Sequence, residues 1–351
     1  MLLPARISIL DRANSRVGFS ASEALHRVLD RARLAEELGY HRFWVAEHHA
    51  VPGIAGSVPA VLMAAIAGRT HSIRVGSGGI MLPNHQPLVV AEQAATLEAL
   101  YPGRIDLGLG RSVGFTQAVR KALKSGKADA ERFEDDLIEL LGYLSGSASV
   151  TVRPRNASLP PVFVLATGSG IETAARAGLA VVLGGPAVFK TDQSGKIPSL
   201  ERYRARFRPS RWFDKPFVMV AVNVAVGPSP DDARKLLLPE AIALARSRTT
   251  GSFAALEPVD NDQEGTLSPR ENTALESSLS TSIYGTAAEV RRQLESLAEA
   301  TGADELLVTG GAFDVVGQSE SDRLLAGIFS RSWHADAESL TDAGRGLRGA
   351  V

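Results

Sequence analysis

The chain has 351 residues, and its 38 lysines and arginines against 39 aspartates and glutamates give a formal net charge of −1 at pH 7. A chain with this balance has no excess of positive charge that would attract nucleic acid or anionic membranes. The 44% hydrophobic and 22% charged residues are typical of a globular protein and exclude disordered, collagen-like and coiled-coil classes.

Cysteine is absent, which excludes disulfides, thiolate metal sites and a cysteine nucleophile, so any redox chemistry needs a bound cofactor. No apolar run reaches the roughly 18 residues of a membrane span. The amino terminus has Arg6, Asp11 and Arg12 where a secretory signal would be apolar. We therefore expect a cytoplasmic protein.

Short β-type runs alternate with helical patterns along the chain. Eight runs are predicted as strands, at residues 6–10, 42–46, 73–76, 104–109, 162–166, 180–183, 216–226 and 305–309. The first helix is predicted from the capping-box spacing of Ser20 and Glu23 to just before Gly39. Further helices are predicted at 57–69, 88–100, 117–144, 171–177, 231–245, 287–300 and 321–329.

Strand–helix alternation through a whole chain predicts a parallel sheet, and eight such units fit a (β/α)8 TIM barrel. We expect one domain over residues 1–333, with insertions near 145–160 and 246–281 because the chain exceeds the roughly 250 residues of this fold. The segment 246–281 is predicted as either a mobile lid or a linker, and 334–351 as a flexible tail. The apolar helices at 57–69 and 88–100 are expected to form a dimer interface.

Enzymes with this barrel place catalytic groups at the carboxyl ends of strands. Glu47, His48 and His49 follow the second predicted strand, and alternation points Glu47 and His49 one way and His48 the other. A histidine titrates near neutral pH, so His48 is a candidate acid–base or hydrogen-bonding group, with a structural role as the alternative. We expect no metal site, because the helical His-x-x-x-His spacing is missing.

After the third strand, Ser77, Gly78 and Gly79 precede Met81, Asn84 and His85. Glycines at a strand end permit unusual backbone geometry or the close approach of a flat ligand, and a tight turn is the alternative. We consider the last three residues as substrate contacts. The candidates for an apolar substrate pocket are Trp44, Phe115 and Phe189, each of which could equally belong to the core.

Two loops carry groups suited to phosphate. Arg111 follows the fourth strand and could act as a fixed cation at the barrel mouth. Thr167, Gly168 and Ser169 follow the fifth strand and lead into a helix, offering hydroxyls and helix-start amides to the same anion. An ordinary helix cap is the alternative, but two such loops on adjacent strands favour a phosphorylated cofactor.

Taken in order, these residues resemble the bacterial luciferase-like family of flavin-dependent monooxygenases. The resemblance rests on LGYHRFWVAEHHAVPGIAGSVPAVL, RVGSGGIMLPNHQPLVVAEQAATLEALYPGRIDLGLGR and the later VRRQLESLAEATGADELLVT. It is strongest over about residues 5–120 and continues more weakly to about 330. It implies a TIM barrel, dimeric in most members, with FMN at the carboxyl ends of the strands.

The resemblance also implies roles for single residues. His48 matches the histidine that supports the flavin hydroperoxide, and Gly78 and Gly79 match a pair joined by a cis peptide under the flavin ring. Arg111 and Thr167 match residues that hold the FMN phosphate. The chain departs from the family in having few serines around Thr167 and Ala166 before it, which implies weaker phosphate binding, and Gly110 at the position of a reactive cysteine, which argues against bioluminescence.

The implied reaction is two-component. A separate NAD(P)H-dependent flavin reductase supplies reduced FMN, O2 is the co-substrate, and a C4a-hydroperoxyflavin oxygenates a small organic substrate, for which a secondary metabolite is one candidate. The alternatives are a deazaflavin-dependent hydride-transfer oxidoreductase and a flavin-binding subunit without catalysis.

Overall fold

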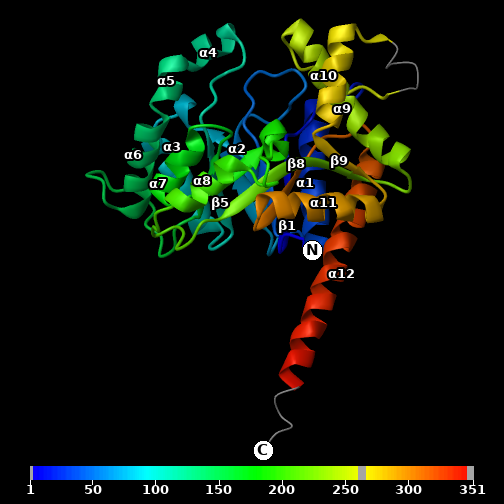
Figure 1. The fold of residues 1–351 in the computed structure, drawn as a ribbon. Coiled ribbons are helices and arrows are strands. Elements are labelled where there is room, and N and C mark those ends of the chain that lie inside the picture. The colour runs from blue at the N-terminus through cyan, green and yellow to red at the C-terminus, as the bar shows by residue number, and fades with distance from the viewer. Residues whose placement is uncertain (1–2, 260–265, 346–351) are drawn as a thin grey trace, which may run out of the picture.

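The computed structural model describes residues 3–259 and 266–345, which form a closed barrel of eight parallel strands surrounded by helices (Figure 1). The barrel strands are β1 (Arg6–Asp11), β2 (Arg42–Val45), β3 (Arg74–Ser77), β5 (Ile105–Gly110), β6 (Val162–Leu165), β7 (Ala180–Gly184), β8 (Val218–Val226) and β10 (Glu305–Thr309). They pair in chain order, and β10 pairs with both β8 and β1, which closes the barrel. The predicted (β/α)8 fold is confirmed.

The strands read as continuous apolar runs because both of their faces are buried. On β2, Phe43 packs outward against the helices, while Trp44 packs into the barrel interior. Inside the barrel the ring of Trp44 meets that of Phe163 edge-on, with centroids 4.9 Å apart. The barrel interior between these strands is thus a packed core.

The helices follow the predicted order, except that one predicted helix is divided and some elements of the structure were not predicted. Those around the barrel are α1 (Ala21–Glu37), α2 (Pro59–Ala67), α3 (Pro87–Leu100), α6 (Phe133–Ser145), α7 (Gly170–Ala177), α8 (Pro198–Arg206), α9 (Pro230–Thr250), α11 (Ala287–Thr301) and α12 (Val315–Arg345). The single helix predicted over 117–144 is divided into α4 (Gln117–Leu123), α5 (Lys127–Glu131) and α6, because Lys124 takes the left-handed conformation and ends α4. The helix α8 and the short strand β4 (Ile80–Met81) were not predicted.

The segment predicted as a lid or linker is largely folded. It contains α10 (Pro269–Leu279), which starts with a capping box of Ser268 and Glu271 and packs Leu275 and Leu279 against α9. The strand β9 (Ser282–Gly285) then pairs with the end of β8 outside the barrel. The polar residues that suggested a lid or linker are explained in part by this helix, which is amphipathic and has one face in solvent. Residues 260–265 of this segment lie outside the described residues.

The predicted tail begins as helix. The helix α12 runs on to Arg345 and projects away from the barrel beside the end where the amino terminus lies (Figure 1), while residues 346–351 lie outside the described residues. The segment 145–160 has no helix or strand beyond Ser145, the last residue of α6. Among the described residues, no helix is long and apolar enough to cross a membrane.

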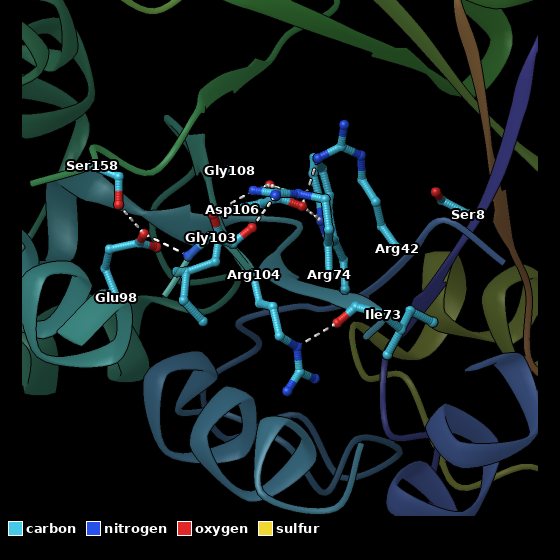
Figure 2. A network of polar contacts seen from close by, with 12 residues as sticks. Ser8, Arg42, Ile73, Arg74, Glu98, Gly103, Arg104, Asp106, Gly108 and Ser158 are labelled. Carbon is cyan, nitrogen blue, oxygen red and sulfur yellow. Dashed lines mark hydrogen bonds and ion pairs between the residues drawn. The ribbon is translucent and has the colours of Figure 1, made fainter. Parts of the chain in front are cut away.

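A buried ionic network closes the barrel at the amino-terminal ends of its strands (Figure 2). Asp106 forms an ion pair with Arg42 Nη1 at 2.8 Å and accepts hydrogen bonds from Arg74 Nη2 at 2.7 Å and from Trp44 Nε1 at 3.0 Å. Arg42 also pairs with Glu305 through Nε, at 2.9 Å. This end of a (β/α)8 barrel serves stability, whereas the opposite end carries function.

Candidate active site

The loops at the carboxyl ends of the barrel strands lie on the side from which α4, α5, α9 and α10 rise (Figure 1). Two cavities open there. One, of about 450 Å³, is lined by His48 and Phe115 among others. The other, of about 490 Å³, is lined by Arg111 and Ser169. Both have the size of small-molecule sites, and they lie at the end of the barrel where such enzymes bind their ligands.

His48 is the third residue after the end of β2 and lines the first cavity, as its predicted role requires. Its carbonyl accepts a hydrogen bond from Ser57 Oγ at 2.9 Å, and its ring stacks on Phe115 with centroids 5.8 Å apart. Burial and then the positive charge of Arg12 lower the pKa of the His48 imidazole to about 4. The Nδ1 atom is buried and has no hydrogen-bond partner in the described part of the chain. At neutral pH, His48 is therefore an uncharged group that can donate or accept a hydrogen bond.

Glu47 and His49 meet His85, but not through the predicted strand alternation, because β2 ends at Val45 and His49 also lines the cavity beside His48. The Glu47 carboxylate lies 2.7 Å from His49 Nε2 and 2.9 Å from His85 Nε2. It also accepts from the Met81 amide at 3.1 Å and from Asn84 Nδ2 at 3.3 Å. Burial raises the pKa of Glu47, but the hydrogen bonds from its partners, His85 foremost, lower it by more. This carboxylate joins the end of β2 to the segment after β3.

This network changes the predicted roles of three residues. Met81, Asn84 and His85 were considered as substrate contacts, but the structure places them around Glu47 and outside the lining of the cavity beside His48. Glu47, His49 and His85 also bring one potential metal ligand each to within 4.8 Å of one another. The histidine spacing did not indicate this, because His85 comes from another loop. The hydrogen bonds account for the cluster without a metal ion.

The predicted cis peptide between Gly78 and Gly79 is present. A Cβ on Gly78 would lie 2.7 Å from Leu10 Cδ1, and one on Gly79 would lie 2.9 Å from the Gly108 carbonyl oxygen. Ser77 is fully buried, and its hydroxyl donates to the Gly108 carbonyl at 2.8 Å, so it joins β3 to β5 and does not face a cofactor. Close packing therefore leaves little room for a side chain at either glycine, and at Gly79 the obstacle is a backbone atom.

Trp44 belongs to the core. It has no exposed surface and donates its indole N–H to Asp106 inside the barrel, so it does not contact substrate. Phe115 is 64% exposed and lines the cavity beside His48, whereas Phe189, at the end of η2 (Gly185–Phe189), does not. Of the three aromatic candidates, the structure retains Phe115 alone.

The two loops predicted to bind phosphate do meet. Arg111 Nη1 donates to Ser169 Oγ at 2.8 Å, which joins the ends of β5 and β6. Thr167 and Gly168 are exposed beside them, a Cβ on Gly168 would meet no atom within 4 Å, and α7 begins at Gly170. An exposed guanidinium, two hydroxyls and a helix start around open space suit a phosphate monoester. These residues therefore fit the phosphate end of a flavin mononucleotide.

Among the residues of the cavity beside His48 that sequence reasoning missed are Arg12, Glu240 and Phe253. Arg12 directly follows β1, so the strand-end rule that selected His48 could have found it. Glu240 lies within α9 and Phe253 in the loop after that helix, and no local pattern marks either residue. Only the packing of α9 over the barrel mouth brings them to the site.

The architecture defines an enzyme-type (β/α)8 barrel with ligand cavities at the carboxyl ends of its strands. The chain matches the model of the luciferase-like monooxygenase family over residues 3–305, and it belongs to this family. It is 40% identical over 313 residues to a luciferase-like monooxygenase of Escherichia coli strain K12, covering 88% of this chain and 92% of that protein.

Two further relatives are informative. The crystal structure of apo-MsnO8 superimposes with a TM-score of 0.78 at 33% identity, covering 93% of this chain and 98% of that one. An N-acetyl-S-alkylcysteine monooxygenase of Bacillus subtilis strain 168 is 41% identical over 210 residues, which cover 58% of this chain and 61% of that protein.

Proposed function

We propose that this protein is an FMN-dependent monooxygenase that transfers one atom of O2 to a small organic substrate. The observation that carries the proposal is the pairing of Arg111 with Ser169 beside Thr167, on the same barrel face as a cavity that contains His48. Reduced FMN, when bound, would supply two electrons to dioxygen, so that one oxygen atom enters the substrate and the other leaves as water.

The chain's own groups have distinct tasks in this reaction. Arg111, Thr167 and Ser169 would hold the FMN phosphate by charge-assisted hydrogen bonds. His48, uncharged at neutral pH, would donate a hydrogen bond to the reacting oxygen or accept one from it. The apolar cavity walls would exclude water from the reacting atoms.

The proposal includes two protein partners. A separate NAD(P)H-dependent flavin reductase would supply the reduced FMN. A second copy of the chain would bind to α2 and α3, because apolar side chains on or beside these helices are exposed: Val61 by 68%, Val58 by 54%, Leu100 by 62% and Val89 by 41%. Exposed apolar groups in such number on two adjacent helices are typical of an interface.

The test mixes the protein with photoreduced FMN without oxygen and then admits oxygen in a stopped-flow spectrometer. We expect a transient absorbance that belongs neither to reduced nor to oxidised FMN, and that His48→Ala shortens. With 18O2 and an N-acetyl-S-alkylcysteine as trial substrate, one labelled atom should enter the product. Reoxidation as fast as that of free FMN, together with tighter binding of a reduced deazaflavin, would contradict the proposal in favour of hydride transfer.

A further inference from the structure

The cavity beside His48 contains one fixed cation. Arg12 directly follows β1, lines this cavity, and has a side chain that is 28% exposed. Its Nη2 atom lies 2.7 Å from Glu240 Oε1, and the Glu240 side chain is only 7% exposed. The carboxylate is thus the buried member of the pair, and the guanidinium is the member that faces the cavity.

Glu240 pairs with this guanidinium but does not use all of its N–H donors. The second oxygen of Glu240 accepts a hydrogen bond from the Gly311 amide, in the loop after β10, so the carboxylate itself is anchored. A guanidinium has five N–H donors in a planar fork. Across the described residues, the ion pair with Glu240 is the one polar contact that Arg12 makes, so the remaining donors are available to a ligand.

The rest of the lining is mostly apolar. Phe115, Val119, Leu244 and Phe253 face the same space, whose volume of about 450 Å³ is that of a small-molecule site. A cavity of this kind orients its ligand by a few polar groups and binds the remainder through apolar contacts. An amine would not suit it, since the only acidic group that the described residues bring to the lining, Glu240, is buried and already has two partners.

We propose that the substrate is an amphipathic organic carboxylate, with its carboxylate bound by the free N–H groups of Arg12 and its apolar part between Phe115 and Phe253, next to His48. Arg12 is then the residue that determines specificity, and Glu240 is the positioning residue that orients it. This inference rests on the proposed function only in taking this cavity as the substrate site.

The experiment measures binding to the full chain by isothermal titration calorimetry, without flavin turnover. The probes are N-acetyl-S-benzylcysteine and its methyl ester, and 4-phenylbutyrate and its primary amide, so that each pair differs in the charged group. We expect wild type to bind each acid at least about 10-fold more tightly than its neutral partner, because a charge-assisted bidentate contact is lost in the latter.

The main variant is Arg12→Met combined with Glu240→Gln, because removing Arg12 alone would leave a buried unpaired carboxylate. The acid preference should fall to about 2-fold or less in this double variant and to an intermediate value in Arg12→Lys, which keeps the charge but loses the planar fork. Arg6→Met, at the other end of β1 and exposed, is the matched control and should keep the wild-type preference.

Equal binding of acid and neutral partner by wild type, no binding of either acid, or an acid preference that survives in the double variant would each overturn the inference. The proposed function fails in a different way, through loss of FMN binding or of the oxygen reaction. Because the calorimetry requires neither, the two failures can be distinguished.

Discussion

His48 is chemically defined by its surroundings, which hold it neutral by burial and by the nearby Arg12. With a pKa of about 4, it does not change protonation between pH 6 and 8, so we expect no titration of activity from this group in that range. His48→Ala should bind reduced FMN normally but lower the rate of oxygenated product by about 100-fold. His26→Ala, on an exposed face of α1, is the control, and unchanged turnover in His48→Ala would exclude His48 from the mechanism.

Arg111 differs from His48 in that its predicted role is binding alone. Arg111→Ala should weaken FMN binding by about 10- to 100-fold, which corresponds to the loss of one charge-assisted hydrogen bond or ion pair. Riboflavin lacks the phosphate, so its affinity should be the same in the variant and in wild type. Fluorescence titration with both flavins measures this, and Lys121→Ala on α4 is the control. An equal loss for the two flavins would refute the phosphate assignment.

At the scale of elements, the closeness of β3 and β5 sets the shape of the barrel mouth. A Cβ on Gly108 would lie 2.0 Å from the Ser77 carbonyl oxygen, a backbone atom that cannot move aside without breaking the strand pairing. Gly108→Ala should therefore lower the free energy of unfolding by about 3 kcal/mol or more. Gly168→Ala meets no atom within 4 Å and should be tolerated. Urea denaturation of both variants tests this, and comparable stability would contradict it.

At the scale of the whole molecule, the ionic network at the closed end supports the barrel from the side opposite the cavities (Figure 2). Asp106→Asn removes the charge that the buried Arg42 and the partly buried Arg74 share, and we expect the free energy of unfolding to fall by about 3 kcal/mol. Asp214→Asn, at an exposed position, is the matched control and should be neutral. Should both variants unfold at the same urea concentration, the network would have no such role.

The proposed dimer also concerns the whole molecule. Val61→Arg places a charge in the centre of the exposed apolar side chains on α2 and should convert a dimer into a monomer, as measured by light scattering coupled to size-exclusion chromatography. Val316→Arg, at a still more exposed valine on α12, is the control and should stay dimeric. A monomeric wild type would contradict the proposal outright.

The sequence by itself determined the barrel. All eight barrel strands lie where the apolar runs predicted them, because strands that are buried on both faces and bounded by turns leave a signal within a few consecutive residues. The pairing of Arg111 with Ser169 was predictable for a related reason. Both follow neighbouring strands, and the carboxyl ends of neighbouring parallel strands share one end of the barrel.

Only the tertiary structure decided how side chains distant in sequence share space. It placed Trp44 and Ser77 in the core, and it joined Glu47 to His85. It also brought Glu240 of α9 to Arg12 at the mouth of the barrel. None of these contacts leaves a local pattern in the sequence. Each joins residues that are far apart in the chain, and barrel closure and helix packing bring those residues together.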